Sequence, residues 1–207
     1  MPNPWPRWSD FQSRIEPWRR LGVVKFANGA EAIAPRPNLA LDGYMFWSYA
    51  PLTLCEIAAT EHRLGFAIPD QLQAFYLRTN GAHLYGAISI AGCVAPEAIV
   101  RDVERPQPVD CLVGNLVRPP DVFVFGSVTA WSVQAKLGVT PSGEVRLINS
   151  EDVTQTLRTW PSFDHFVFDE MDRLAALHGE DGVFSGEYAQ RLPPEARHLE
   201  RKRPRRH

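Results

Sequence analysis

The chain has 207 residues, of which 44% are hydrophobic and 22% charged, and its formal net charge at pH 7 is −2. This length and composition predict one globular domain, or one domain with tails, since single domains commonly run to about 200 residues. No stretch approaches the roughly 18–20 consecutive apolar residues of a membrane span, and the N-terminus lacks the pattern of a secretory signal. We therefore expect no membrane association.

The number and spacing of the cysteines indicate a reducing compartment. Cys55, Cys93 and Cys111 are few, odd in number and widely spaced, which is typical neither of a disulfide framework nor of a zinc site. We interpret all three as packing residues of a cytoplasmic protein.

The charge is unevenly distributed. The last eleven residues, RHLERKRPRRH, hold six Lys and Arg residues and one Glu, which leaves 16 basic and 23 acidic residues in 1–196, a net charge of −7. A basic tract attracts phosphates. However, the body is acidic and contains no recognisable nucleic-acid-binding motif, so the pattern does not favour direct nucleic-acid binding.

Residues 1–50 are rich in proline and aromatic residues and are interpreted as an N-terminal extension packed on the core. Ser9-Asp10-Phe11-Gln12 has the form of a capping box, and Pro17 limits the helix that follows. Residues 23–27 and 30–34 predict two short strands around Asn28-Gly29, a hairpin turn signal.

Residues 51–81 predict two helices with well-marked ends. Thr53-Leu54-Cys55-Glu56 is a second capping box, followed by apolar residues at helical spacing. Gly65 stands where a left-handed residue ends a helix, and Pro69 suits the first turn of the next. Asn80-Gly81 ends that second helix.

The rest of the chain predicts a sheet and one final helix. Strand patterns occupy 85–93, 122–125, 130–137 and 144–148, with Trp131, Ala135 and Leu137 facing inward and Lys136 outward. The proline-rich segment 94–120 predicts a long surface connection. Residues 162–178 predict the last helix, and 179–207 predict a partly disordered polar extension with a basic tail.

The order of these features resembles the SUKH superfamily, specifically its Smi/Knr-like members. The resemblance rests on the run Ile-Ala-Ala-Thr-Glu-His-Arg-Leu-Gly-Phe-Ala-Ile-Pro at 57–69, on Phe75, Asn80-Gly81 and Phe125-Gly126, and on Ser162-Phe163 at the start of the last helix. It covers about residues 51–178, which we therefore assign to the core domain.

The resemblance implies an α+β fold, a single SUKH-like domain with a mainly antiparallel sheet packed against helices. It also implies that the signature residues hold the fold together, and we expect the Glu61 carboxylate to accept hydrogen bonds rather than act in catalysis. These signature residues are Glu61, Gly65, Ile68, Pro69, Asn80 and Gly81.

The sequence contains no motif for catalysis or cofactor binding. The histidines lack metal-ligand spacing, and no nucleotide-binding glycine motif or nucleophile elbow is present. Cys55 lies early in a helix but lacks the companion residues of a cysteine nucleophile. We expect no enzyme, no cofactor and no metal site.

By its resemblance, the chain is expected to be an immunity protein that neutralises a cognate bacterial toxin, a nuclease being one candidate, by direct binding. The alternative is a regulatory scaffold for protein–protein interactions. Binding residues concentrate on long loops held by a rigid sheet. As partner contacts we therefore select Asp102, Glu104, Asp110 and Asp121, with ordinary solvated charges as the competing interpretation. The sequence leaves the partner and the oligomeric state open.

Overall fold

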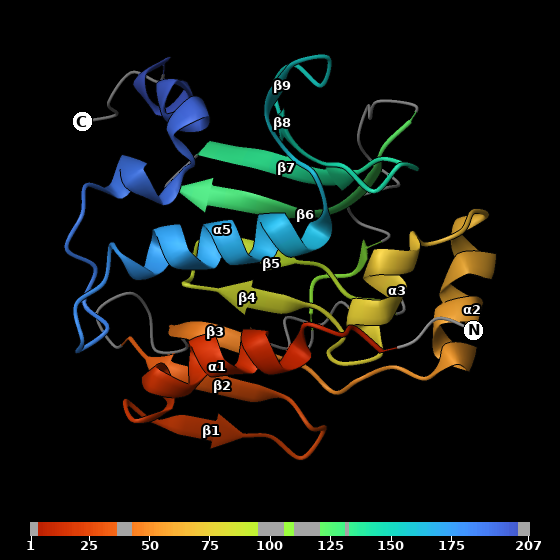
Figure 1. Ribbon diagram of the computed structural model, residues 1–207, viewed down its shortest axis with the longest axis horizontal. Helices are drawn as coiled ribbons and strands as arrows, with labels where there is room; N and C mark the ends of the chain where they lie inside the picture. The colour runs from red at the N-terminus through yellow and green to blue at the C-terminus, as the bar shows by residue number, and fades with distance from the viewer. Residues whose placement is uncertain (1–3, 37–42, 95–105, 110–120, 131–132, 203–207) are drawn as a thin grey trace.

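The computed structural model describes residues 4–36, 43–94, 106–109, 121–130 and 133–202 (Figure 1). Its centre is a nine-stranded sheet in which the strands follow their sequence order and each pairs antiparallel with the next. The strands are β1 (Val23–Lys25), β2 (Glu31–Pro35), β3 (Tyr44–Ser48), β4 (Ala82–Leu84), β5 (Ile88–Ile90), β6 (Phe123–Ala130), β7 (Val133–Val139), β8 (Val145–Asn149) and β9 (Thr156–Trp160). The expected α+β class is confirmed.

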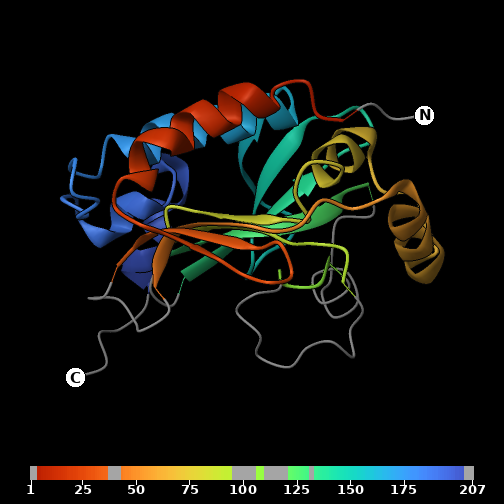
Figure 2. The ribbon, with the colours of Figure 1, turned by 90° about the horizontal axis from the view of Figure 1, so that it is seen from below.

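Two long helices cover one face of the sheet. Helices α1 (Trp8–Arg19) and α5 (Phe163–Ala175) lie side by side across it, as Figures 1 and 2 show. Two shorter helices, α2 (Leu54–Leu64) and α3 (Asp70–Tyr76), come between β3 and β4, and the 3₁₀ segments η2 (Tyr188–Arg191) and η3 (Pro194–Lys202) follow α5. In the described part of the chain no helix is long and apolar enough to cross a membrane.

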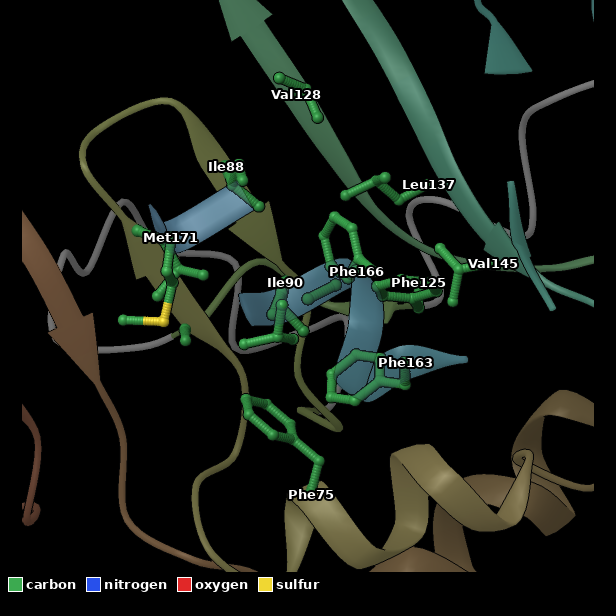
Figure 3. Close-up of a cluster of buried hydrophobic side chains, with 14 of the residues drawn as sticks. Phe75, Ile88, Ile90, Phe125, Val128, Leu137, Val145, Phe163, Phe166 and Met171 are labelled. Carbon is green, nitrogen blue, oxygen red and sulfur yellow. The ribbon is translucent and has the colours of Figure 1, made fainter. Parts of the chain in front are cut away.

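The core lies between the sheet and these helices. Figure 3 shows Phe163, Phe166 and Met171 of α5 against side chains of β5, β6 and β7, including Ile88 and Leu137. All five side chains are at most 1% exposed. Burial of such a side chain contributes about 1.5–3 kcal/mol, so this layer supplies much of the driving force for folding.

The N-terminal region belongs to the same core. The Trp5 indole donates a hydrogen bond of 2.6 Å to Asp164, and its ring stacks on Phe168 of α5. Arg14 of α1 pairs with Asp172 at 2.8 Å. Contrary to the expected capping box, α1 begins at Trp8 with no side-chain cap, and it continues through Pro17 to Arg19.

The second face of the sheet is also largely covered. A cross-strand row of Trp47, His83, Ser89, Ser127 and Lys136 runs along it from β3 to β7. Lys136 is only 9% exposed, which differs from the outward position expected from alternation in this strand. Residue 131, expected to face inward, lies outside the described residues.

The described part of the C-terminal extension packs on the core. η2 and η3 place Leu192, Ala196 and Leu199 in the main core, at most 7% exposed. The guanidinium of Arg173 on α5 fixes this segment because it donates to the carbonyl oxygens of Gln190 and Arg191. The extension therefore forms part of the folded domain up to the last described residues.

Candidate functional site

A groove of about 600 Å³ lies at one end of the sheet. One wall is the connector between α2 and α3, and the other is the turn between β7 and β8, with the start of β6 between them. Its lining residues are Phe66, Ala67, Ile68, Pro69, Asp70, Gln71, Asp121, Val122, Phe123, Val139, Thr140, Pro141, Ser142 and Gly143.

The first wall is fixed by the helix ends that flank it. Helix α2 begins at the Thr53–Glu56 capping box and ends at Gly65, whose φ of +75° is left-handed. The connector then turns back, and the Glu61 carboxylate accepts hydrogen bonds from the Ile68 amide at 2.8 Å and from Gln73 Nε2 at 3.0 Å. These two hydrogen bonds hold the connector between the end of α2 and the start of α3.

Gln71 joins the two walls. Its Nε2 donates to the Gly143 carbonyl oxygen at 3.4 Å, across the groove from α3 to the β7–β8 turn. Its Oε1 accepts from the Phe163 amide at 2.7 Å, at the start of α5. One side chain therefore holds three elements that are far apart in the sequence.

The bottom of the groove is apolar. Phe66 meets Phe123 edge-on, with 5.7 Å between ring centroids. Val122, Phe123 and Val139 are at most 7% exposed, while Phe66 is only partly buried. A concave apolar surface with a few polar groups at its edge is typical of a binding site.

The rim is mainly acidic. Arg146 of β8 pairs with Asp121 at 3.2 Å and with Glu144 at 2.8 Å, and the hydrogen bond that it donates to Glu144 is the main cause of its raised pKa. Asp121 keeps 53% of its side chain exposed, and Asp70 is exposed on the opposite wall. The groove is therefore lined by the two carboxylates of Asp70 and Asp121, and Asp121 is paired with Arg146 beside it.

A model of the SMI1 / KNR4 family (SUKH-1) matches residues 51–169. The chain belongs to this family. The match confirms the resemblance found in the sequence and includes every residue that lines the groove. Helix α1 and strands β1, β2 and β3 lie before the matched region, so the N-terminal part of the core is additional to it. No curated protein and no solved structure matches this SUKH-1 protein.

The structure brings some of the predicted site residues to the groove. Asp121 is on its rim, and Ile68 and Pro69 form part of its wall. Residues 102, 104 and 110, the other selected carboxylates, lie outside the described residues. Asn80 and Gly81 are elsewhere, at the start of β4, where Asn80 Oδ1 accepts a hydrogen bond of 2.7 Å from the Cys93 amide.

The cysteine and histidine side chains considered for catalysis lie apart from one another. Cys55 is exposed on α2, although we expected it to be a packing residue, and His165 bonds to Ser162 at 2.8 Å. Among the described residues no three His, Cys, Asp or Glu side chains gather as metal ligands would. The groove itself presents an apolar bottom with charged residues at its edge.

Sequence reasoning missed most of the groove. Residues 66–71 and 139–143 meet only in the folded chain, and no local pattern marks Gln71 as the link between them. The one signal available was the turn sequence Pro141-Ser142-Gly143, which indicates a turn but not what it faces.

Proposed function

We propose that this protein is a cytoplasmic, non-enzymatic immunity protein that binds a cognate bacterial toxin directly and blocks it by steric occlusion. The observation that carries the proposal is membership of the SUKH-1 family over residues 51–169. The proposal gains support from a preformed groove whose walls are fixed by Glu61 and Gln71.

The groove suits a partner with an apolar side chain beside basic residues. Phe66 and the apolar bottom would receive the apolar anchor, because buried aromatic contacts dominate the energy of many interfaces. Asp121 and Asp70, which line the groove, would face Lys or Arg on the toxin, which favours association and specificity. Many nucleases present such a basic surface to their substrate, so a nuclease remains one candidate.

The carboxylates Asp102, Glu104 and Asp110 precede Asp121 in the chain and stay proposed as partner contacts on sequence grounds. The double charge reversal Asp102→Lys with Glu104→Lys tests these carboxylates separately from the groove. An unchanged affinity and salt dependence would remove them from the contact surface while leaving the groove proposal intact.

Co-expression tests the function. The toxin gene that neighbours this one in the genome is induced in bacteria with and without the protein, and growth is measured. We expect wild-type protein to restore growth and a variant with Phe66→Arg and Asp121→Lys to fail, while Glu180→Lys, which reverses a 94% exposed carboxylate outside the groove, protects normally. Absence of a neighbouring toxin, together with several co-purifying cellular proteins, would support the regulatory scaffold instead.

A further inference from the structure

Three basic side chains gather where the end of β2, the end of α5 and η2 come together. Arg36 follows β2, His178 follows α5 and Arg191 ends η2. Arg36 Nη1 lies 3.3 Å from His178 Nε2, and both Arg36 and Arg191 are close enough to lower the pKa of His178 by their charge. This cluster is separate from the groove.

Arg191 is the most deeply buried of the three. It is 3% exposed, and its guanidinium lies 4.4 Å from the ring centre of Tyr188 and 4.9 Å from that of Phe184. Its Nη1 reaches the Tyr188 hydroxyl at 3.2 Å and the Gly86 carbonyl at 3.5 Å, whereas its Nε is buried without a hydrogen-bond partner. A buried unpaired N–H group is costly and indicates a missing acceptor.

His178 behaves as a neutral acceptor. Its Nδ1 lies 2.8 Å from the Leu174 carbonyl oxygen, which can only accept, so Nδ1 carries the proton and Nε2 accepts from Arg36. Burial, together with the charges of Arg36 and Arg191, lowers the pKa of His178 to about 4. The imidazole therefore adds no counter-charge to the two guanidinium groups.

No described carboxylate pairs with Arg36 or Arg191, unlike three other partly buried arginines of the fold. Arg19 has Glu31, Arg158 has Glu170, and Arg173 has Glu170. Arginine keeps its charge in proteins, and buried charges are normally paired. Stacking on Phe184 and Tyr188 offsets part of the cost for Arg191 but supplies no negative charge.

The backbone around the cluster is also unusual. Ala34, two residues before Arg36, has φ +58°, and Tyr85, next to Gly86, has φ +53°. These are the non-glycine residues with left-handed backbone in the described chain, and the Tyr85 ring lies 5.2 Å from that of His178. Such strain persists where the surrounding structure enforces it and concentrates at binding sites.

We infer that Arg36 and Arg191 form a binding site for a phosphate group. Two fixed positive charges match the double charge of a phosphate monoester or of inorganic phosphate, and the planar guanidinium groups present N–H donors in the geometry that phosphate oxygens accept. The unpaired Nε of Arg191 would gain its acceptor, and Arg36 would exchange its bond to His178 for a stronger, charge-assisted one.

The test is a titration of the full chain with inorganic phosphate, in buffer free of other multivalent anions, followed by NMR at the amides of Arg36, Gly86 and Leu192. We expect saturable shifts with a Kd of about 1 mM or tighter. Arg36→Gln should weaken binding at least about tenfold, since a hydrogen bond to a charged group is lost. Lys25→Gln, which removes a cation whose side chain is 74% exposed, should not change it.

The outcomes separate the explanations. Failure of the wild-type protein to show saturable shifts overturns the site, whether or not the variants fold. Equal weakening by Lys25→Gln and Arg36→Gln also overturns it, because binding would then follow net charge alone. Repeating the titration with glycerol phosphate identifies the source: binding at least about tenfold tighter than that of inorganic phosphate assigns the site to an organic monoester.

Discussion

Glu61 and Ile68 are joined across the turn between α2 and α3 by a hydrogen bond of 2.8 Å from the Ile68 amide to Glu61 Oε1. Ile68 is 1% exposed, so its amide has little access to water once this acceptor is removed. We expect Glu61→Ala to lower the free energy of unfolding by about 1–3 kcal/mol, measured by urea denaturation. His62→Ala, at the next, exposed position of α2, is the control, and equal midpoints for the two variants would contradict this role of Glu61.

The signature glycines Gly65 and Gly81 should differ in their response to Ala. Both have left-handed φ, of +75° and +87°, which costs an alanine about 1–2 kcal/mol. A Cβ at Gly65 would meet no atom within 4 Å, whereas one at Gly81 would lie 2.7 Å from the Ile90 carbonyl oxygen. Gly81→Ala should therefore be more destabilising by about a further 1–3 kcal/mol in the same urea experiment. Equal losses would show that space at Gly81 is not limiting.

Arg173 connects α5 to the C-terminal segment and balances a fully buried carboxylate. It pairs with Glu170, which is 0% exposed, at 2.6 Å, and it donates to the Arg191 carbonyl at 2.8 Å. Arg173→Met should lower the free energy of unfolding by about 3–5 kcal/mol, because a buried charge loses its closest partner. Limited proteolysis should then cut within 188–202 before the rest of the chain.

Arg20→Met is the matched control for Arg173. Arg20 lies 3.7 Å from Glu180, and both side chains are exposed, by 58% and 94%. An exposed pair of this kind contributes about 0–1 kcal/mol. If the two variants lose the same stability, the buried pair does not hold the C-terminal segment.

Local signals made the helical part predictable. Gly65 ends α2 where the sequence predicted, and the capping box of Thr53 and Glu56 is formed. Both features depend only on residues close in the chain, so the sequence contains all that decides them.

Strands covered on both faces were harder to predict. Strand β3, with the sequence YMFWS, was missed because Phe46 faces the main core while Trp47 packs in a second cluster with Ala32 and Tyr49, which removes the alternation expected of a half-buried strand. Strand β9 was also missed. The core positions of Leu192 and Leu199 were not predicted, because prolines and charged residues flank both. The groove and the arginine cluster depend on tertiary contacts and have no local pattern.

Stability should fall on acidification because of His83. Burial lowers the pKa of His83 to about 4 in the folded protein, whereas the unfolded imidazole titrates near 6.5. Below pH 6.5 the unfolded chain binds the proton first, so the free energy of unfolding decreases as pH falls from about 6.5 to 4, by at most about 3 kcal/mol.

His83→Gln should reduce this pH dependence, measured as urea midpoints at several pH values. His178, whose pKa is also lowered to about 4, contributes to the remaining slope. His62→Gln, which replaces an exposed imidazole of α2, is the control variant. If the urea midpoint of His83→Gln depends on pH as strongly as that of the wild-type protein, the His83 imidazole is protonated as readily in the folded as in the unfolded chain.

The most direct test of the proposed function is calorimetric titration of the purified protein with the toxin encoded beside it, at low and high salt. We predict a 1:1 complex that weakens as salt rises. Asp121→Lys should weaken the complex at least about tenfold, because it reverses a charge on the rim of the groove, and Glu180→Lys should not. No measurable complex with the wild-type protein would contradict the immunity function. A tight complex that Asp121→Lys and Phe66→Arg leave unchanged would contradict the groove as its binding surface.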